Sequence, residues 1–81
     1  MMTLKEFIKE HYGSNVRMAL ALDVTPQVVS NWVVRDPHLC LKHMIQIVDQ
    51  TKCSPRRLHD VVVETEKLIN GTSIQGSVDP G

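Results

Sequence analysis

Hydrophobic residues recur at spacings of three and four along most of the chain, and polar residues fill the positions between them. This period is typical of helices that bury one face and leave the other in water. The first segment begins after Thr3 and ends near residues 11–13, and the second is capped by Ser14 or Asn15 and ends at about Leu22. A third runs from Thr25 to about Val34, a fourth follows Pro37, and a fifth reaches from Ser54 to about Asn70. No segment alternates in the manner of a β-hairpin. The sequence therefore predicts an all-α fold of five helices.

Residue types that favour helix ends stand at the expected positions. Thr3 and Glu6 have the spacing of a capping box. Thr25 and Ser54 are each followed by a proline, which fits the first position of a helix because its missing N–H is not needed there. The proline after Asp36 predicts a break, since a residue before proline is pushed out of helical conformation. These signals divide the chain at the same places as the hydrophobic pattern.

The end of the chain has a different composition. Gly71 stands where a fifth helix is expected to end, at about Asn70. The stretch that follows, GTSIQGSVDPG, has only two isolated aliphatic residues. We therefore expect residues 1–70 to form one domain and residues 71–81 a flexible C-terminal tail.

A tight break at residues 23–25 separates the second and third segments. Apolar residues at helical spacing on both sides of it predict a shared inner side: Ala19, Leu22, Val24, Val28, Val29 and Trp32. Asp23 must then adopt the left-handed conformation, which aspartate tolerates better than most residues other than glycine. We expect Trp32 in the core. Two short helices joined in this way are typical of a helix-turn-helix.

The outer side of the third segment is polar. Gln27, Ser30 and Asn31 carry amides and a hydroxyl, which are groups that hydrogen-bond to base edges, and Thr25 can add a contact from its capping position. Helix starts and cations favour phosphates. The candidate phosphate contacts are Asn15, Arg17, Arg35, His38 and Lys42. The pattern indicates a recognition helix for a DNA groove.

The fourth segment contributes apolar side chains that we expect to point mostly inward: Cys40, Leu41, Met44, Ile45, Ile47 and Val48. Imidazole and thiol groups in and near it are of the types that bind zinc: His38, Cys40, His43, Cys53 and His59. Their spacing does not place three ligands on one helical face. We therefore expect no metal and no cofactor.

The fifth segment has more apolar surface than its own domain needs. Its core-facing stripe comprises Leu58, Val61, Val62, Leu68 and Ile69. Val63 extends this surface around the helix, and a run of β-branched residues has poor helix propensity unless packing compensates. We expect Val63, with Ile69, at a two-fold contact of a weak homodimer.

Charge and size qualify this picture. The chain has 81 residues, and a domain of this size hides only about 60% of its unfolded surface, so a second subunit would help. The formal net charge is zero, but residues 1–57 hold eight Lys and Arg against five Asp and Glu, whereas residues 58–81 hold one against four. The third segment, with the candidate base-contact residues, lies within the basic residues 1–57. The surplus of three charges in this part predicts weak non-specific binding.

Several classes of protein are disfavoured. Cys40 and Cys53 form no C-x-x-C pair, which favours a reducing compartment. No stretch approaches the roughly 20 apolar residues of a membrane span, and none resembles a signal peptide, so we expect a soluble cytoplasmic protein without membrane contact. The sequence has no Gly-rich phosphate loop, paired carboxylates or nucleophile–base pair, so we do not expect an enzyme.

Three stretches carry a resemblance to a known family. The first segment ends in an aromatic residue and Gly13; residues 15–34 hold the turn with a buried-type Trp32; and TKCSPRRL opens the fifth segment with a pattern similar to Ser-Pro-x-x-Leu. Over residues 3–63 the chain resembles the Cro/cI/Xre class of helix-turn-helix repressors. FIKEHYG, followed by a motif that ends in SNW, is especially similar to all-helical phage Cro proteins and YdaS-like relatives.

The resemblance implies a five-helix, lambda-repressor-like domain with the helix-turn-helix at its second and third helices. It places Gln27, Ser30 and Asn31 at positions that reach into the major groove. Two residues depart from the family pattern: Asp23 stands where glycine is frequent, and Pro26 where many members have glutamine. The amide contact of that glutamine is not carried over to Pro26, and Gln27 is the nearest substitute.

The function implied is that of a Cro-like repressor from a phage or prophage, which binds a double-stranded DNA operator as a dimer in the cytoplasm of a bacterial host. No ligand-sensing domain is visible, so no small-molecule effector is expected. One alternative is a helix-turn-helix antitoxin or plasmid-control protein whose tail binds a partner protein. Another is a protein-interaction module that has lost DNA binding, which the neutral net charge and the missing glutamine would suit.

Overall fold

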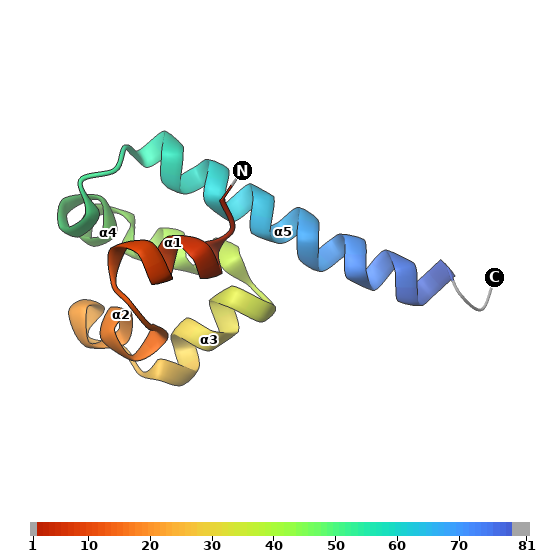
Figure 1. Cartoon of the computed structure of the whole chain (residues 1–81), viewed down its shortest axis with the longest axis horizontal. Coiled ribbons are helices and arrows are strands. Elements are labelled where there is room, and N and C mark those ends of the chain that lie inside the picture. The colour runs from red at the N-terminus through yellow and green to blue at the C-terminus, as the bar shows by residue number, and fades with distance from the viewer. Residues whose placement is uncertain (1, 79–81) are drawn as a thin grey trace.

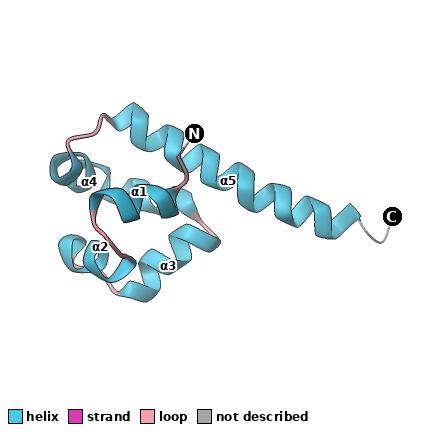
Figure 2. Ribbon diagram, viewed as in Figure 1, coloured by secondary structure: helices cyan, strands magenta, loops and turns pink. Residues whose placement is uncertain are grey.

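The computed structural model describes the backbone of residues 2–78 and the side chains of residues 2–71. Five α-helices and one 3-10 helix make up this part of the chain: α1 (Leu4–His11), α2 (Asn15–Leu22), α3 (Pro26–Val34), η1 (Pro37–His43), α4 (Met44–Thr51) and α5 (Pro55–Val78). No strand occurs within residues 2–78 (Figure 2). The all-α prediction is confirmed.

Serine and threonine side chains cap the starts of α1, α2, α3 and α5. The backbone N–H of Glu6 donates to the Thr3 hydroxyl, and the N–H of Thr3 donates to the Glu6 carboxylate at 2.9 Å, which completes the capping box. Ser14, Thr25 and Ser54 each accept a hydrogen bond from the backbone N–H three residues later. Each cap satisfies a donor that has no partner within its own helix.

One core joins all the elements. Helix α1 lies in the middle of the body and contacts α2, α3 and α5 (Figure 1). The largest buried side chains include Phe7, Leu4, Ile8, Met18, Ile47 and Leu58, which come from α1, α2, α4 and α5. Val29 and Trp32 add the inner side of α3 to the same cluster. Trp32 is therefore a core residue, as predicted.

A buried threonine links the first helix to the last. The Thr65 side chain is 3% exposed, and its hydroxyl accepts a hydrogen bond of 2.6 Å from the backbone N–H of Leu4. The same hydroxyl donates to the carbonyl of Val61 at 2.8 Å. Thr65 thus gives a partner to one of the N–H groups in the first turn of α1, which a helix cannot satisfy internally.

The fourth segment differs from its prediction as a single helix. It begins as the 3-10 helix η1, in which residues three apart share a side. This period buries Pro37 and Cys40 and half-buries His43. Ile45 is 86% exposed, so its predicted inward orientation is wrong. It stands two residues before the buried Ile47, which puts the two on nearly opposite sides of α4.

The fifth helix is longer than predicted. It does not end at Asn70 but runs through Gly71 to Val78, beyond the body of the molecule (Figure 1). Gly71 does not have the left-handed conformation that a helix-ending glycine requires. Leu68 is 62% exposed, although its spacing predicted a core position, because the core that covers the stripe ends near Thr65. The predicted tail over residues 71–81 lies partly outside the described residues.

Candidate nucleic-acid interface

The turn between α2 and α3 has the backbone geometry that its sequence requires. Asp23 is left-handed, with φ 58° and ψ 44°. The N–H of Asp23 donates to the carbonyl of Leu20 at 3.3 Å, and the N–H of Val24 donates to that of Ala19 at 2.9 Å. These bonds satisfy carbonyls at the end of α2 and close the turn. The left-handed conformation predicted for Asp23 is confirmed.

Helix α3 starts immediately after this turn. Thr25 has an extended backbone, and its hydroxyl accepts a hydrogen bond of 3.3 Å from the N–H of Val28. Pro26 occupies the first helical position. On the inner side of α3, the Trp32 ring lies 5.5 Å from the His43 ring, measured between centroids. The start of α3 and its inner side are both fixed by contacts within the chain.

The outer side of α3 carries the predicted base-contact residues. Gln27 is exposed, and Asn31, one turn later, is half-buried. Ser30 is also half-buried, and Thr25 is exposed with its oxygen used in the cap. Residues four apart lie on one helical face, so Gln27 and Asn31 form a continuous polar row. The two amide side chains thus lie on the same face of α3.

One residue on this helix was placed on the wrong side. Val28 was predicted to lie inward with Val29 and Trp32, but it is 36% exposed whereas they are 0% and 2% exposed. One residue corresponds to about 100° of rotation around a helix, so Val28 lies at the edge of the buried stripe. The helical period by itself could have predicted that Val28 is more exposed than Val29. Val34, at the other end of α3, is 59% exposed.

The candidate phosphate contacts come from three elements. Asn15 and Arg17 lie in the first turn of α2, Arg35 follows the last residue of α3, and Lys42 lies on η1. Arg17, Arg35 and Lys42 are exposed and form no ion pair with any residue that the structure describes.

His38, the fifth candidate, is already partnered. Its Nε2 pairs with a carboxylate oxygen of Glu66, which joins the start of η1 to α5. A phosphate at His38 would have to compete with this carboxylate. His38 therefore differs from Arg17, Arg35 and Lys42, which have no ion-pair partner among the described residues.

A hydrogen-bonded bridge supports the end of α2, and sequence reasoning missed it. The Tyr12 hydroxyl donates to the Gln50 side-chain oxygen at 2.7 Å, and the Gln50 amide nitrogen donates to the carbonyl of Ala21 at 2.8 Å. Burial raises the pKa of Tyr12 to about 12, and the neighbouring Cys53 adds to this effect. The phenol is therefore protonated at neutral pH and remains a donor. Nothing local in the sequence predicts a pair 38 residues apart.

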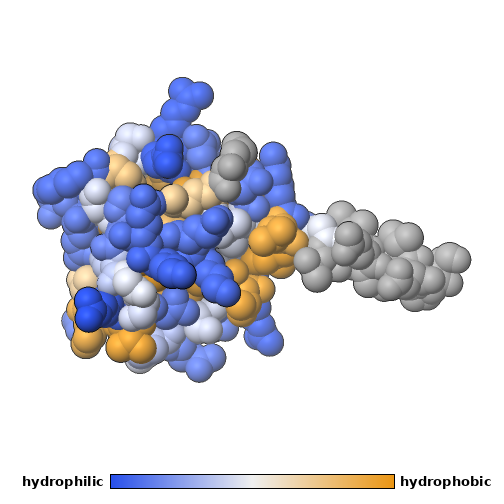
Figure 3. Space-filling view, in the orientation of Figure 1, coloured by the Kyte–Doolittle hydropathy of each residue, from blue (hydrophilic) through white to orange (hydrophobic). Residues whose placement is uncertain are grey.

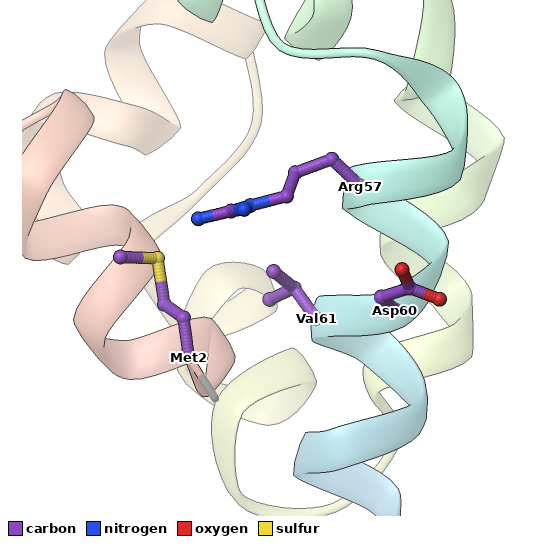
Figure 4. A pocket seen from close by; sticks show the side chains of 4 residues that line it. All are labelled: Met2, Arg57, Asp60 and Val61. Atoms are coloured by element: carbon purple, nitrogen blue, oxygen red, sulfur yellow. The ribbon is translucent and has the colours of Figure 1, made fainter.

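Two hollows in the surface lie away from α2 and α3. One of about 130 Å³ is lined by Met2, Arg57, Asp60 and Val61, and Figure 4 shows the Arg57 side chain extending from α5 toward Met2. A second, wider one is lined by residues of α1, the end of α4 and the start of α5. Neither has a lining residue from α2 or α3. The first is smaller than the roughly 300 Å³ at which small-molecule sites begin.

Within the described part of the chain, no three His, Cys, Asp or Glu side chains come close enough together to hold a metal ion. None of its helices combines the length and the apolar character needed to cross a bilayer.

Comparisons with protein-family models, curated proteins and solved structures gave no match. The residues of α2, α3 and η1 are therefore the basis for a function.

Proposed function

We propose that this chain is a sequence-specific double-stranded DNA-binding transcriptional regulator, a Cro-like repressor that occupies a promoter operator as a dimer. In this proposal α2, the turn at Asp23 and α3 form the helix-turn-helix of a lambda-repressor-like domain. The observation that carries it is the two-sidedness of α3. Its inner side is buried through Val29 and Trp32, while its outer side presents Gln27 and Asn31 in one row.

The polar row of α3 supplies the proposed base readout. A glutamine or asparagine amide can form two hydrogen bonds with the N6 and N7 atoms of adenine in the major groove. Gln27 lies in the first turn of α3, where recognition helices contact base edges. Ser30 can donate to or accept from a base, and the Thr25 hydroxyl can still donate while its oxygen accepts the cap bond.

The proposed phosphate contacts fix the orientation of α3 on the duplex. The first turn of α2 offers N–H groups and a positive dipole end, and Arg17 adds a formal charge there. Arg35 follows the end of α3, and Lys42 is exposed on η1. Such contacts strengthen binding to any sequence and carry no base preference. His38 would contribute only by exchanging Glu66 for a phosphate.

The dimer in this proposal uses α5. One domain of this size covers a half-site, and two recognition helices about 34 Å apart would cover an operator. Val63 and Ile69, the proposed contact residues, are both half-buried within the chain. They are six residues apart, which corresponds to about 120° around a helix. A two-fold contact is therefore centred on one of them. We place the centre at Val63.

Four alanine variants test the assignment of roles. Gln27→Ala and Asn31→Ala should each weaken binding to the preferred sequence by about 1–3 kcal/mol and leave non-specific binding nearly unchanged. Arg35→Ala and Lys42→Ala should weaken binding to all sequences alike and lower the salt slope by about one. The preferred sequence is first selected from a random DNA pool, and affinities are then measured by gel shift at several salt concentrations.

Two results would contradict the proposal. If selection enriches no sequence, the chain is not a sequence-specific DNA-binding protein. If both pairs of variants lose specific and non-specific affinity in the same ratio, the division into base and phosphate contacts is wrong. Thermal unfolding of each variant, followed by circular dichroism, controls for loss of fold, because all four residues lie outside the buried core.

A specific observation favours a second candidate function, a protein-interaction module without DNA binding. Val16 and Leu20, one turn apart on α2, are 53% and 77% exposed. Figure 3 shows hydrophobic surface over this part of the molecule. Exposed apolar surface of this kind marks protein contacts when it is contiguous. A gel shift separates the candidates, since an interaction module would give no salt-dependent DNA binding.

A further inference from the structure

Val28 is an apolar side chain at the edge of the buried stripe of α3, next to the polar row of Gln27 and Asn31. It is the third residue of α3 and is 36% exposed. It follows Gln27 directly and precedes Asn31 by three residues, so it adjoins the polar row at the start of the helix. A serine, glutamine or lysine at this position would leave less apolar surface in water. The exposure of Val28 suggests that a ligand of α3 covers it.

The major groove of DNA contains one apolar group that a valine side chain could contact. Among the groups on the base edges there, the C5 methyl of thymine is the one that neither donates nor accepts a hydrogen bond. An adenine read by the amide of Gln27 has neighbouring base pairs within reach of the next side chain on the same turn. We propose that Val28 is a specificity-determining residue that contacts a thymine methyl group beside the base pair read by Gln27. This inference rests on the proposed function.

Val34 provides an internal comparison. It is also a valine of α3 and is more exposed than Val28, at 59%. It is the last residue of the helix, about 9 Å farther along the axis than Val28 and about 120° around it. Recognition helices contact bases through their N-terminal residues, so Val34 lies away from the base edges. Valine can therefore be replaced by alanine at both positions, and only the change at Val28 is expected to alter recognition of a thymine methyl group.

The experiment combines a change in the DNA with a change in the protein. In the selected operator, each thymine is replaced in turn by deoxyuridine, which removes only the C5 methyl group. The wild-type chain should lose about fourfold in affinity at one thymine of each half-site, which corresponds to burial of one methyl group at about 0.8 kcal/mol. Val28→Ala should bind the thymine operator about fourfold more weakly and should no longer distinguish thymine from uracil at that site.

Val34→Ala is the matched control and should keep the wild-type ratio of affinities for the two operators. The inference is overturned if Val28→Ala keeps that ratio, or if no thymine methyl matters although the chain binds a defined sequence. It is also overturned if Val34→Ala loses the ratio and Val28→Ala does not. These results leave the proposed function intact. Absence of any selected sequence would instead refute the proposed function, and the inference with it.

Discussion

Replacing Thr65 by valine tests whether the buried hydrogen bond to α1 contributes to stability. Valine has the shape of threonine with a methyl group in place of the hydroxyl. The backbone N–H of Leu4 would lose its acceptor at 2.6 Å in a position where the Thr65 side chain is only 3% exposed. The carbonyl of Val61 also loses a donor, but it can still accept the regular bond within α5.

The expected cost follows from this geometry. A buried donor left without a partner costs about 1–3 kcal/mol. For Thr65→Val we therefore expect a loss of about 2 kcal/mol in the free energy of unfolding, and a fall in Tm of about 10 °C for a domain of this size. The control is Thr65→Ser, which keeps the hydroxyl and loses one methyl group, at about 0.8 kcal/mol. Threonine, serine and valine have similar helix propensities, so α5 itself is little affected.

Urea denaturation followed by circular dichroism measures both variants. The reasoning predicts that the serine variant is more stable than the valine variant, although valine is the more hydrophobic. Burial of apolar surface alone predicts the reverse order. A valine variant equal to or more stable than the serine variant would show that the hydroxyl of Thr65 does not hold the start of α1.

Two further predictions concern the dimer and the response to alkaline pH. Val63→Glu should abolish cooperative operator binding while the monomer stays folded, as followed by sedimentation and circular dichroism. The control, Val63→Ala, should keep cooperativity. Unaltered cooperativity in Val63→Glu would place the contact on another face. Burial raises the pKa of the Cys40 thiol from 9.0 to about 12, so the native state favours the neutral thiol and stability should fall as pH rises from about 9 toward 12. Cys40→Ala should show a smaller fall in Tm between pH 8 and pH 11 under reducing conditions, and an equal fall would exclude the thiol as a cause.

Local signals in the sequence were enough to predict where most helices begin. The caps at Thr3, Thr25 and Ser54 act on N–H groups three residues away, so their effect depends on neighbours along the chain. The same holds for the turn, where Asp23 adopts a left-handed conformation that satisfies carbonyls of the preceding helix. Pro37 likewise marks a real break. These features depend on short-range geometry and can be identified without a tertiary structure.

Features that depend on distant parts of the chain could not be predicted in this way. The hydrogen bond between Thr65 and Leu4 joins residues 61 positions apart. Ile45 and Ile47 lie on nearly opposite sides of α4, and it is Ile47 that the other helices bury. Leu68 continues the apolar spacing of α5 past the point where the core covers it. Periodicity indicates which side of a helix is apolar but not how far a neighbouring element extends.

For the candidate site, the sequence identified the row of Gln27 and Asn31 but not what holds that row in place. The start of α3 depends on the turn at Asp23, which follows Ala21 by two residues. The carbonyl of Ala21 accepts a hydrogen bond from Gln50, and Gln50 is held in turn by Tyr12. The position of α3 thus depends on the C-cap residue of α1, on α2 and on α4 through this bridge. It also depends on η1, because the His43 ring lies tilted against the Trp32 ring. Under the proposed function, affinity for an operator therefore depends on side chains that never meet DNA. A rigid support for α3 lowers the ordering cost of binding, because the row is already in place before DNA arrives.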